Sequence, residues 1–456
     1  MDILIYTLRS VAYAITDPEL VLILIILAFI LHSQNRKTVT MQKMIIGEGM
    51  NSPLELTVSQ IVIGIFAGAI GSIILSYLGV AFSENSAIYL IFLISIFFML
   101  WNPKFICFAY SGALLGAISL ILDIIAKSYA GTSINIAGNT IDMANINVLN
   151  IDITSLMTMV AVLHLVEGIL VMVDGSRGAL PVFTNRDNKI IGGFALKRYW
   201  ALPIALFFIV HKTGSVGLTE QVATPNWWPL LKGTSPISLV KDAALGLFAF
   251  YGVIGYNSIT FTRSKKEKTF VSGTALIIYS IALFLLAQVS VYGIFYKALV
   301  LIFAPVAHEL MLYYTRYLEV SGKPKYVSSD EGIMVLEVAP SSPAEEMGIR
   351  SGDLLIDVNG RKIENEQDIL NASKEGSNFI SFKLKNAKKE IKDVEYNKLN
   401  SNKRLGIVFV PKNIPSESTI VKLEESKFRD ILNKMKDNSD NNKDDNNKDD
   451  NNSSQE

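Results

Sequence analysis

The sequence is poor in the residues that build disulfides and metal centres. Its 456 residues include one cysteine, Cys107, and four histidines. A single cysteine forms no disulfide within the chain, and by itself it makes no metal site. Because Cys107 lies in an apolar run, we expect it to be a small buried hydrophobic residue. The 42 basic and 42 acidic residues cancel. The sequence therefore predicts no metal site, no cofactor and no nucleic-acid partner.

The histidines also lack the pattern of an intramembrane metalloprotease. That chemistry needs two histidines one helical turn apart around a glutamate. The nearest match, His308-Glu309-Leu310-Met311-Leu312, has Leu312 where the second histidine would stand. His164 and Glu167 have the wrong spacing. The sequence also shows no phosphate-binding loop and no nucleophile constellation, so we predict no catalytic residues and no enzyme activity.

Charge is missing from long parts of the first 320 residues. Residues 56–83, 85–103, 105–122, 243–262 and 269–296 contain no charged side chain. A bilayer core needs about 20 apolar helical residues, and a charge at its centre costs about 2.5–3.5 kcal/mol on insertion scales. Residues 1–320 therefore predict a multi-span membrane domain of about eight or nine helices. The nine expected helices lie near residues 20–35, 60–80, 86–102, 105–125, 155–173, 195–211, 243–261, 269–288 and 290–307.

Positive charges in short loops set the orientation of such a domain. Lysine and arginine are concentrated in loops 36–55, 174–198 and 262–268, and the alternate loops carry fewer for their length. If all nine helices cross the membrane, the basic loops lie on one side. We then expect the N-terminus outside and the C-terminal segment in the cytoplasm.

Two of the alternate loops have features of their own. Loop 211–242 contains Trp227-Trp228-Pro229, which is typical of an aromatic anchor at the membrane interface; a ligand lid is the alternative. Loop 126–154 alternates small, polar and apolar residues, so it predicts either a short hairpin or a segment on the membrane surface.

Four ionisable residues fall within or beside the expected spans: His164, Glu167, His308 and Glu309. Such groups usually face the interior of a bundle and pair with one another. We expect a structural polar contact between the fifth and ninth helices, or a position at the membrane boundary for His308 and Glu309. An ion or proton pathway is the alternative.

Residues 328–412 carry the signals of a small α+β domain. Ser342, Pro343 and Glu345 form a helix start with a capping box, and Gly348 ends that short helix. Asn359-Gly360 predicts a tight hairpin turn. A second helix is expected from about residue 365 to 374. Strands are expected at 354–358, 380–384 and 405–410, where apolar residues alternate or run together.

This order of motifs resembles the PDZ domain in its bacterial arrangement. In such domains a partner peptide adds as a strand to a sheet edge and packs against the second helix. The resemblance implies an edge at Gly332, Ile333, Met334 and Val335, with Ile369 and Ala372 on the helix opposite. Leu405, Gly406 and Ile407 are a second candidate for the turn that holds the peptide carboxylate. A PDZ fold with a closed groove is the alternative to both.

The remaining residues, 413–456, differ in composition from the rest. Residues 416–436 predict a modest amphipathic helix. Residues 438–456 consist mainly of Asn, Asp, Lys and Ser. Such a segment buries too little apolar area to order itself, so we predict a disordered tail.

The whole layout resembles the MinJ family of bacterial division-site topology proteins. The resemblance rests on the spans, a His164-x-x-Glu167 segment, Lys197-Arg198-Tyr199-Trp200, Trp227-Trp228-Pro229 and the terminal PDZ domain. It implies a non-enzymatic scaffold in the cell membrane, enriched at the septum or poles. By the same resemblance, the partners are the coiled-coil protein DivIVA and the division inhibitor MinD. The alternatives are a PDZ-bearing regulator of a membrane protease or of an envelope or sporulation complex, and a transporter with a regulatory PDZ domain.

Overall fold

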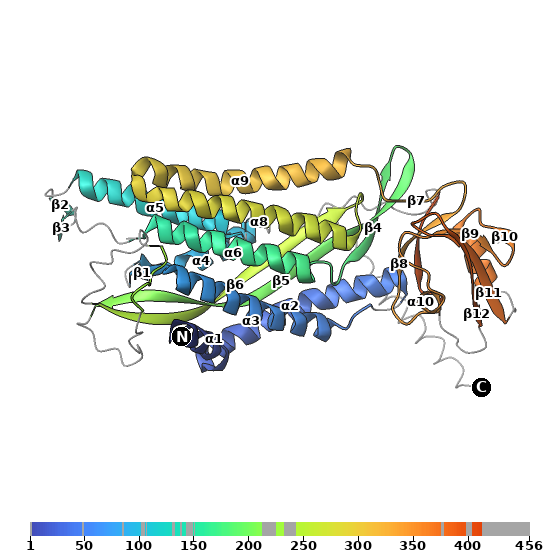
Figure 1. Ribbon diagram of the computed structural model, residues 1–456, viewed down its shortest axis with the longest axis horizontal. Helices are drawn as coiled ribbons and strands as arrows, with labels where there is room; N and C mark the ends of the chain where they lie inside the picture. The colour runs from blue at the N-terminus through green and yellow to red at the C-terminus, as the bar shows by residue number, and fades with distance from the viewer. Residues whose placement is uncertain are drawn as a thin grey trace, which may run out of the picture.

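The computed structural model shows an elongated helical domain with a small sheet-rich domain at one end (Figure 1). It describes residues 2–47, 50–83, 86–101, 105, 107–129, 133–136, 139–142, 149, 151–211, 225–231, 243–374, 378–397 and 404–412. The tail predicted at 413–456, with its helix at 416–436, lies outside these residues.

The first domain is a polytopic helical membrane domain. In the part of the chain that the structure describes, six helices are long and apolar enough to cross a bilayer. Phe29, Phe66 and Leu285 on these helices expose 60–73% of their surface, as expected for side chains that face lipid. The six are α2 (Pro18–Ile46), α3 (Pro53–Leu78), α5 (Phe108–Ser128), α6 (Ile153–Asp174), α8 (Lys265–Val289) and α9 (Ile294–Ser321).

Local chemistry fixes where several of these helices begin and end. Asp17 accepts hydrogen bonds from the amides of Glu19 and Leu20 at the start of α2, and Ser264 and Glu267 form a capping box at the start of α8. Gly47 and Gly79 end α2 and α3 in the left-handed conformation. Two shorter helices, α1 (Asp2–Thr16) and α4 (Leu90–Trp101), complete this part.

The sixth and seventh expected helices are wrong, because both segments are strands. They form β5 (Lys189–His211) and β6 (Ala243–Thr260), which pair antiparallel from Phe194↔Thr260 to His211↔Ala243. An apolar run without charge does not by itself distinguish a helix from a buried strand. Pro203 in the first run and three glycines in the second disfavour a helix. The remaining expected segments are helical, although the third is only the 12-residue helix α4.

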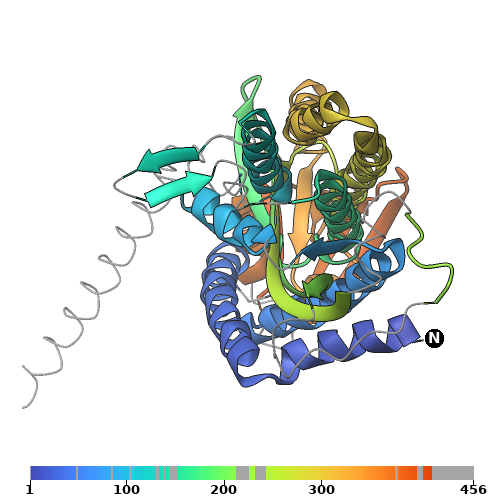
Figure 2. The ribbon, with the colours of Figure 1, turned by 90° about the vertical axis from the view of Figure 1, so that its left-hand side faces the viewer.

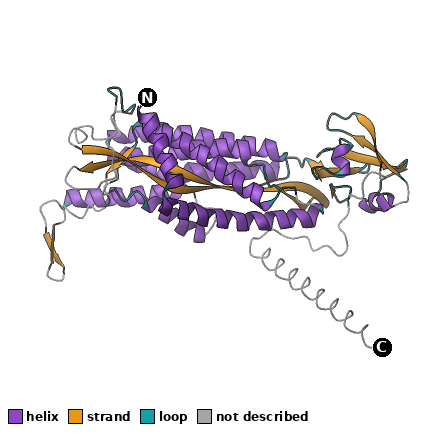
Figure 3. Ribbon diagram, turned by 90° about the horizontal axis from the view of Figure 1, so that it is seen from below, coloured by secondary structure: helices purple, strands orange, loops and turns teal. Residues whose placement is uncertain are grey.

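Helices surround these two long strands (Figures 2 and 3). Backbone polar groups inside a bilayer must be satisfied within the protein. β4 (Leu180–Arg186) and β1 (Ala81–Ser83) pair with the two ends of the β5 edge opposite β6. Between them, α3 covers the edge. Ser72 Oγ accepts the Ala205 N–H at 2.9 Å, and Pro203, two residues earlier, has no N–H to satisfy.

Close backbone contact between α3 and β5 depends on two glycines. A Cβ atom on Gly64 would lie 2.2 Å from the Ala201 carbonyl oxygen, and one on Gly68 would lie 2.3 Å from that of Pro203. Only glycine allows the helix to approach the strand so closely.

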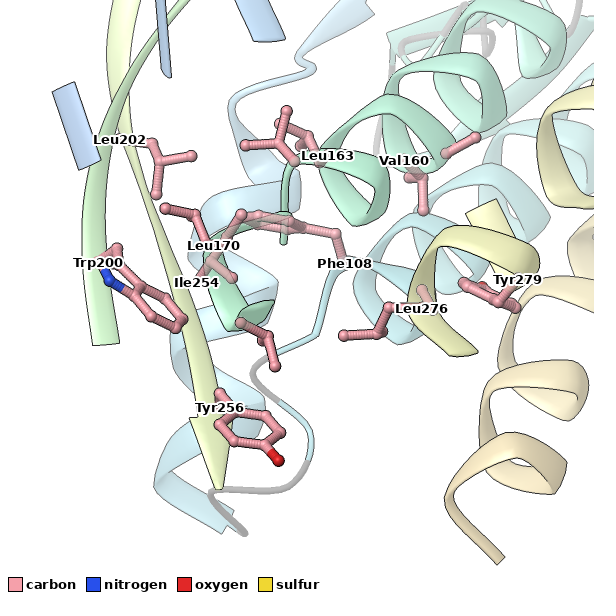
Figure 4. Packing of buried hydrophobic residues seen from close by; sticks show 14 of the residues in the cluster. Phe108, Val160, Leu163, Leu170, Trp200, Leu202, Ile254, Tyr256, Leu276 and Tyr279 are labelled. Carbon is pink, nitrogen blue, oxygen red and sulfur yellow. The ribbon is translucent and has the colours of Figure 1, made fainter. Parts of the chain in front are cut away.

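The main core lies between the strands and α6 (Figure 4). Trp200 and Leu202 of β5 and Ile254 of β6 pack in one buried cluster with Leu163 and Leu170 of α6. On the strand side the cluster extends to α3 and on the other side to α8 and α9. The strands are therefore part of the interior of the bundle.

The loop expected between residues 126 and 154 contains a short hairpin. Strands β2 (Ser133–Ile136) and β3 (Asn139–Asp142) pair antiparallel. This matches the hairpin alternative of the two that the sequence left open.

The second domain has the elements that local turn chemistry predicts. Ser342 caps the short helix α10 (Pro343–Glu346), and Gly348 follows it with φ +79°. Asn359 and Gly360 both have positive φ in the predicted hairpin turn. The elements are β7 (Tyr326–Val327), β8 (Ile333–Val338), α10, β9 (Leu354–Val358), β10 (Arg361–Lys362), α11 (Glu366–Lys374), β11 (Phe379–Lys385), β12 (Ile391–Asn397) and β13 (Ile407–Val410).

Candidate functional site: the peptide groove, its junction with the membrane domain and a buried polar cluster

The expected peptide-binding edge at residues 332–335 is wrong. The strand order of the sheet is β12-β11-β9-β8-β13, so β8 is an inner strand. Met334 is paired on both sides, with Leu354 of β9 and with Val410 of β13. Gly332 lies so close to β9 that an added Cβ atom would be 2.1 Å from the Leu355 carbonyl oxygen. β13 therefore pairs with the side of β8 to which the sequence analysis assigned a partner peptide.

The strand that does form an edge, β13, begins at Ile407, directly after Leu405 and Gly406. β13 pairs with β8 on one side, and no described strand pairs with its other side. Gly406 has φ +73°, and its carbonyl accepts the Ala339 N–H at 2.8 Å. A Cβ atom on Gly406 would lie 2.3 Å from Ser342 Cβ. The turn that opens β13 is thus held against the start of α10 and requires glycine.

The structure brings most of the predicted groove residues into one cluster. Ile369 and Ala372 of α11 are buried in the same apolar cluster as Ile333 and Val335, and the half-buried Leu405, Ile407 and Phe409 pack against it. Met334 departs from this set, because it packs against the core of the membrane domain. The predicted helix and the second candidate turn therefore share one apolar floor.

The sheet-rich domain is attached firmly to the end of the membrane domain. β7 pairs with β5 at Ile191↔Val327 and Gly192↔Tyr326. A Cβ atom on Gly192 would lie 2.7 Å from Val410 Cγ2, so β13 also packs on this surface. Val408 and Val410 belong to the core cluster of the membrane domain, whereas Ile407 and Phe409 face the core of their own domain.

Charged pairs surround the same junction. Lys265 at the start of α8 forms an ion pair with the buried Glu337 of β8. Lys325 and Glu267 form a second pair at 2.6 Å. Between them Tyr326 is buried against Phe194 in an edge-to-face contact with centroids 5.5 Å apart. Burial raises the pKa of the Tyr326 phenol, so it stays neutral in this apolar contact.

A second constellation lies within the membrane domain, where α5, α6 and α9 meet. Cys107 Sγ is 2.9 Å from Nε2 of His164 and 3.6 Å from Nε2 of His308. The polar contact expected between the fifth and ninth helices is present, with the two imidazole centroids 5.6 Å apart. Cys107 does more than fill apolar space, which sequence reasoning missed. Its partners lie 57 and 201 residues away, so no local pattern links them.

The groups around this cluster are also polar. Glu167 lies one helical turn beyond His164, with Oε2 4.0 Å from His164 Nε2. Tyr110 donates a hydrogen bond to Glu309 and lies 3.3 Å from Nδ1 of His308. Cysteine, histidine and carboxylate side chains are the ligands of zinc and related metals. Among the described residues, one group of at least three such side chains has its ligand atoms within 4.8 Å of one another, and it is Cys107, His164 and His308.

Comparison with known proteins identifies the C-terminal fold. The family model described as PDZ domain matches residues 334–378. The C-terminal domain is a PDZ domain. PDZ domains bind peptides by strand addition, and β13 is an edge strand of the sheet among the described residues.

Two curated relatives show similarity over different lengths. The cell division topological determinant MinJ of Bacillus subtilis (strain 168) is 25% identical over 224 residues, which are 48% of this chain and 52% of MinJ. The putative serine protease HhoB of Synechocystis sp. is 34% identical over 56 residues, which are 12% of this chain and 14% of HhoB. The chain thus spans about half the length of MinJ and a small part of HhoB. No solved structure matches the chain.

Proposed function

We propose that this chain is a non-enzymatic membrane adaptor that gathers partner proteins at the cell-division site through its PDZ domain. The observation that carries the proposal is the similarity to MinJ over 224 residues, combined with a PDZ domain that has an unpaired sheet edge among the described residues. The resemblance to MinJ implies DivIVA and MinD as the partners.

The PDZ domain faces the cytoplasm in this proposal. The ends of α2 and β4 and the start of α8 all lie at the PDZ end of the membrane domain (Figure 1). The three basic loops, 36–55, 174–198 and 262–268, therefore lie at this end. Although two of the expected helices are strands, β5 and β6 still run between the two ends of the bundle, so the three basic loops remain together at one end. By the positive-inside rule, this end is cytoplasmic.

The peptide of a partner adds to β13 in this proposal. Its backbone pairs with the open edge of residues 407–410, and its terminal carboxylate meets the turn at Leu405 and Gly406. Side chains of the peptide pack against α11, where Ile369 and Ala372 supply the apolar floor. The domain boundaries that fit this scheme are 1–320 for the membrane domain, 328–412 for the PDZ domain and 413–456 for the tail.

The junction explains why an adaptor benefits from this architecture. Because β7, Val410 and the Lys265–Glu337 pair fix the PDZ domain to the bundle, a bound partner is held at a set orientation against the membrane. A flexible tether would localise a partner without orienting it.

Localisation in growing cells tests this function. A fluorescent fusion of the full chain is compared with one truncated after Lys325, which keeps the membrane domain. We expect the full chain at septa or poles, and altered cell length in cells that have only the truncated form. Uniform membrane fluorescence of the full chain with normal cell length would contradict the division role.

The similarity to HhoB favours a second candidate, a regulator of a membrane protease, although it covers only 56 residues. In that case the full chain co-purifies with a protease, and loss of the PDZ domain changes the turnover of membrane substrates. Cell length and the position of the septum then stay normal, so the same cells distinguish the two functions.

A further inference from the structure

Two side chains from membrane helices and one from the cap of a third helix converge on one point inside the bundle. Cys107 precedes the first residue of α5, His164 lies on α6 and His308 on α9. His164 and His308 expose 1% and 5% of their surface. Ionisable side chains placed here are costly in a membrane protein unless they bind one another or a ligand, so this convergence needs a chemical reason.

Hydrogen bonds at Nδ1 of both imidazoles orient the two rings so that each Nε2 is directed toward Cys107. Nδ1 of His164 is 2.7 Å from the Val160 carbonyl oxygen, which only accepts, so Nδ1 carries the proton. Tyr110 donates its own proton to Glu309, so its oxygen accepts from Nδ1 of His308 at 3.3 Å. Each histidine then presents an unprotonated Nε2 toward Cys107. Metal-binding histidines almost always donate their other ring N–H to a carboxylate, a backbone carbonyl or water, and the Val160 carbonyl accepts in this way from His164.

The ligand atoms of Cys107, His164 and His308 lie within 4.8 Å of one another, close to the spacing of a tetrahedral site. With Zn–S of about 2.3 Å and Zn–N of about 2.0 Å, ligand atoms of a tetrahedral site lie roughly 3.3–3.6 Å apart. Cys107 Sγ already lies 3.6 Å from His308 Nε2. The 2.9 Å separation from His164 Nε2 would need to widen by about half an ångström. A change of that size is within the reach of side-chain rotation.

Charge balance favours Glu167, which lies beside the group of three, as the fourth ligand. Glu167 Oε2 lies 4.0 Å from His164 Nε2 and 13% of its side chain is exposed. A divalent cation with one thiolate, one carboxylate and two neutral imidazoles has zero net charge, which suits an interior of low dielectric. Soft sulfur with imidazole nitrogen favours zinc or copper over magnesium or calcium.

We propose that Cys107, His164 and His308, with Glu167 as the fourth ligand, bind a zinc-class transition-metal ion that ties α5, α6 and α9 together within the membrane. The ring of Tyr279 closes the site, since it packs edge-to-face on His164 and His308 with centroids 5.1 and 5.5 Å apart. Four protein ligands make the site a structural one. It is independent of the groove in the PDZ domain.

The first test is the metal content of the full chain, purified in detergent without chelators and without a histidine tag. Elemental analysis by mass spectrometry should find about one zinc ion per chain. A Cys107→Ser/His308→Asn variant should lose it. The matched control is His32→Asn, which removes a histidine of α2 outside the cluster and should retain the ion.

The second test needs no variant that risks misfolding. The natural chain is stripped of metal and titrated with Co²⁺, which replaces zinc and absorbs light. Because Cys107 is the sole cysteine of the chain, a near-ultraviolet thiolate-to-cobalt band reports this site alone. Substoichiometric zinc together with no thiolate–cobalt band would overturn the proposal and leave a hydrogen-bonded thiol–imidazole cluster.

Discussion

Arg198 and Asp174 form an ion pair with only 1% of each side chain exposed. Arg198 Nε lies 3.0 Å from Asp174 Oδ2, and the Trp200 indole N–H donates to the same oxygen at 2.9 Å. The guanidinium also donates to Ser59 Oγ of α3 at 2.9 Å. One carboxylate at the end of α6 therefore joins β5, α6 and, through Arg198, α3.

Removal of this carboxylate should destabilise the membrane domain. Asp174→Ala leaves a buried guanidinium without its counter-ion, and breaking a buried pair in this way costs about 3–5 kcal/mol. Thermal unfolding of the full chain in detergent should show a clearly lower midpoint. Asp187→Asn in the exposed β4–β5 turn is the control and should leave the midpoint unchanged. Equal shifts of the unfolding midpoint in the two variants would show that the buried ion pair stabilises the domain no more than an exposed charge does.

The close approach of α3 to β5 gives a second prediction. Gly68→Ala places a methyl group 2.3 Å from the Pro203 carbonyl oxygen, which is rigid backbone. Overpacking of this kind typically costs about 1–3 kcal/mol. Gly71→Ala lies on the same helix, but its methyl group would meet only Val166 Cγ2 at 3.3 Å. We expect a lower unfolding midpoint for Gly68→Ala than for Gly71→Ala. A lower unfolding midpoint for Gly71→Ala than for Gly68→Ala would contradict the close packing of α3 on β5.

These contacts show which parts of the fold are visible in the sequence. Helix α3 is predicted because it is long and free of charge from Leu56 onward, and α6 because it is long and apolar apart from His164 and Glu167. The strands β5 and β6 are equally apolar, so composition alone did not separate them from helices. Arg198 is informative in retrospect. Arg198 is buried and its neighbour Lys197 is exposed, and this alternation of buried and exposed residues is typical of a strand. Counting charges placed both residues in a basic loop instead.

The candidate sites were predicted only where their chemistry is local. The Ser342 cap and the Asn359-Gly360 turn are set by neighbouring residues, so they were found. The edge strand was misassigned because strand order depends on pairing between Met334 and Val410, which are distant in sequence. The approach of Cys107 to His308 depends on the packing of three helices, and one sequence carries no signal for it.

The junction between the two domains gives a third prediction. Glu337 is 5% exposed and its ion pair with Lys265 joins β8 to α8. Glu337→Ala leaves Lys265 without this partner and should loosen the PDZ domain from the bundle, at a cost of about 1–3 kcal/mol. Hydrogen exchange should become faster in β7 and β13 while α6 keeps its protection. The charge exchange Lys265→Glu/Glu337→Lys should restore part of the protection. Unchanged exchange in Glu337→Ala would show that apolar contacts alone hold the junction.

The turn at the start of β13 gives a prediction on peptide binding. Gly406→Ala forces a side chain into the left-handed region, at roughly 1–2 kcal/mol, and directs its methyl group to within 2.3 Å of Ser342 Cβ. The turn must move, and with it the edge at Ile407. Gly348→Ala carries the same backbone strain at φ +79°, but nothing lies within 4 Å of its added methyl group. Gly348→Ala is therefore the matched control, because it introduces the same backbone strain without moving β13.

The measurement uses the full chain in detergent and a library of peptides with free C-termini. Peptides selected on the natural sequence are measured by fluorescence anisotropy on both variants. We expect Gly406→Ala to weaken binding at least roughly tenfold, ~1.4 kcal/mol, and Gly348→Ala to change it little, because only the first substitution moves the strand to which the peptide adds. A library that yields no binder on the natural sequence indicates a closed groove. Equal losses in the two variants place the peptide away from β13.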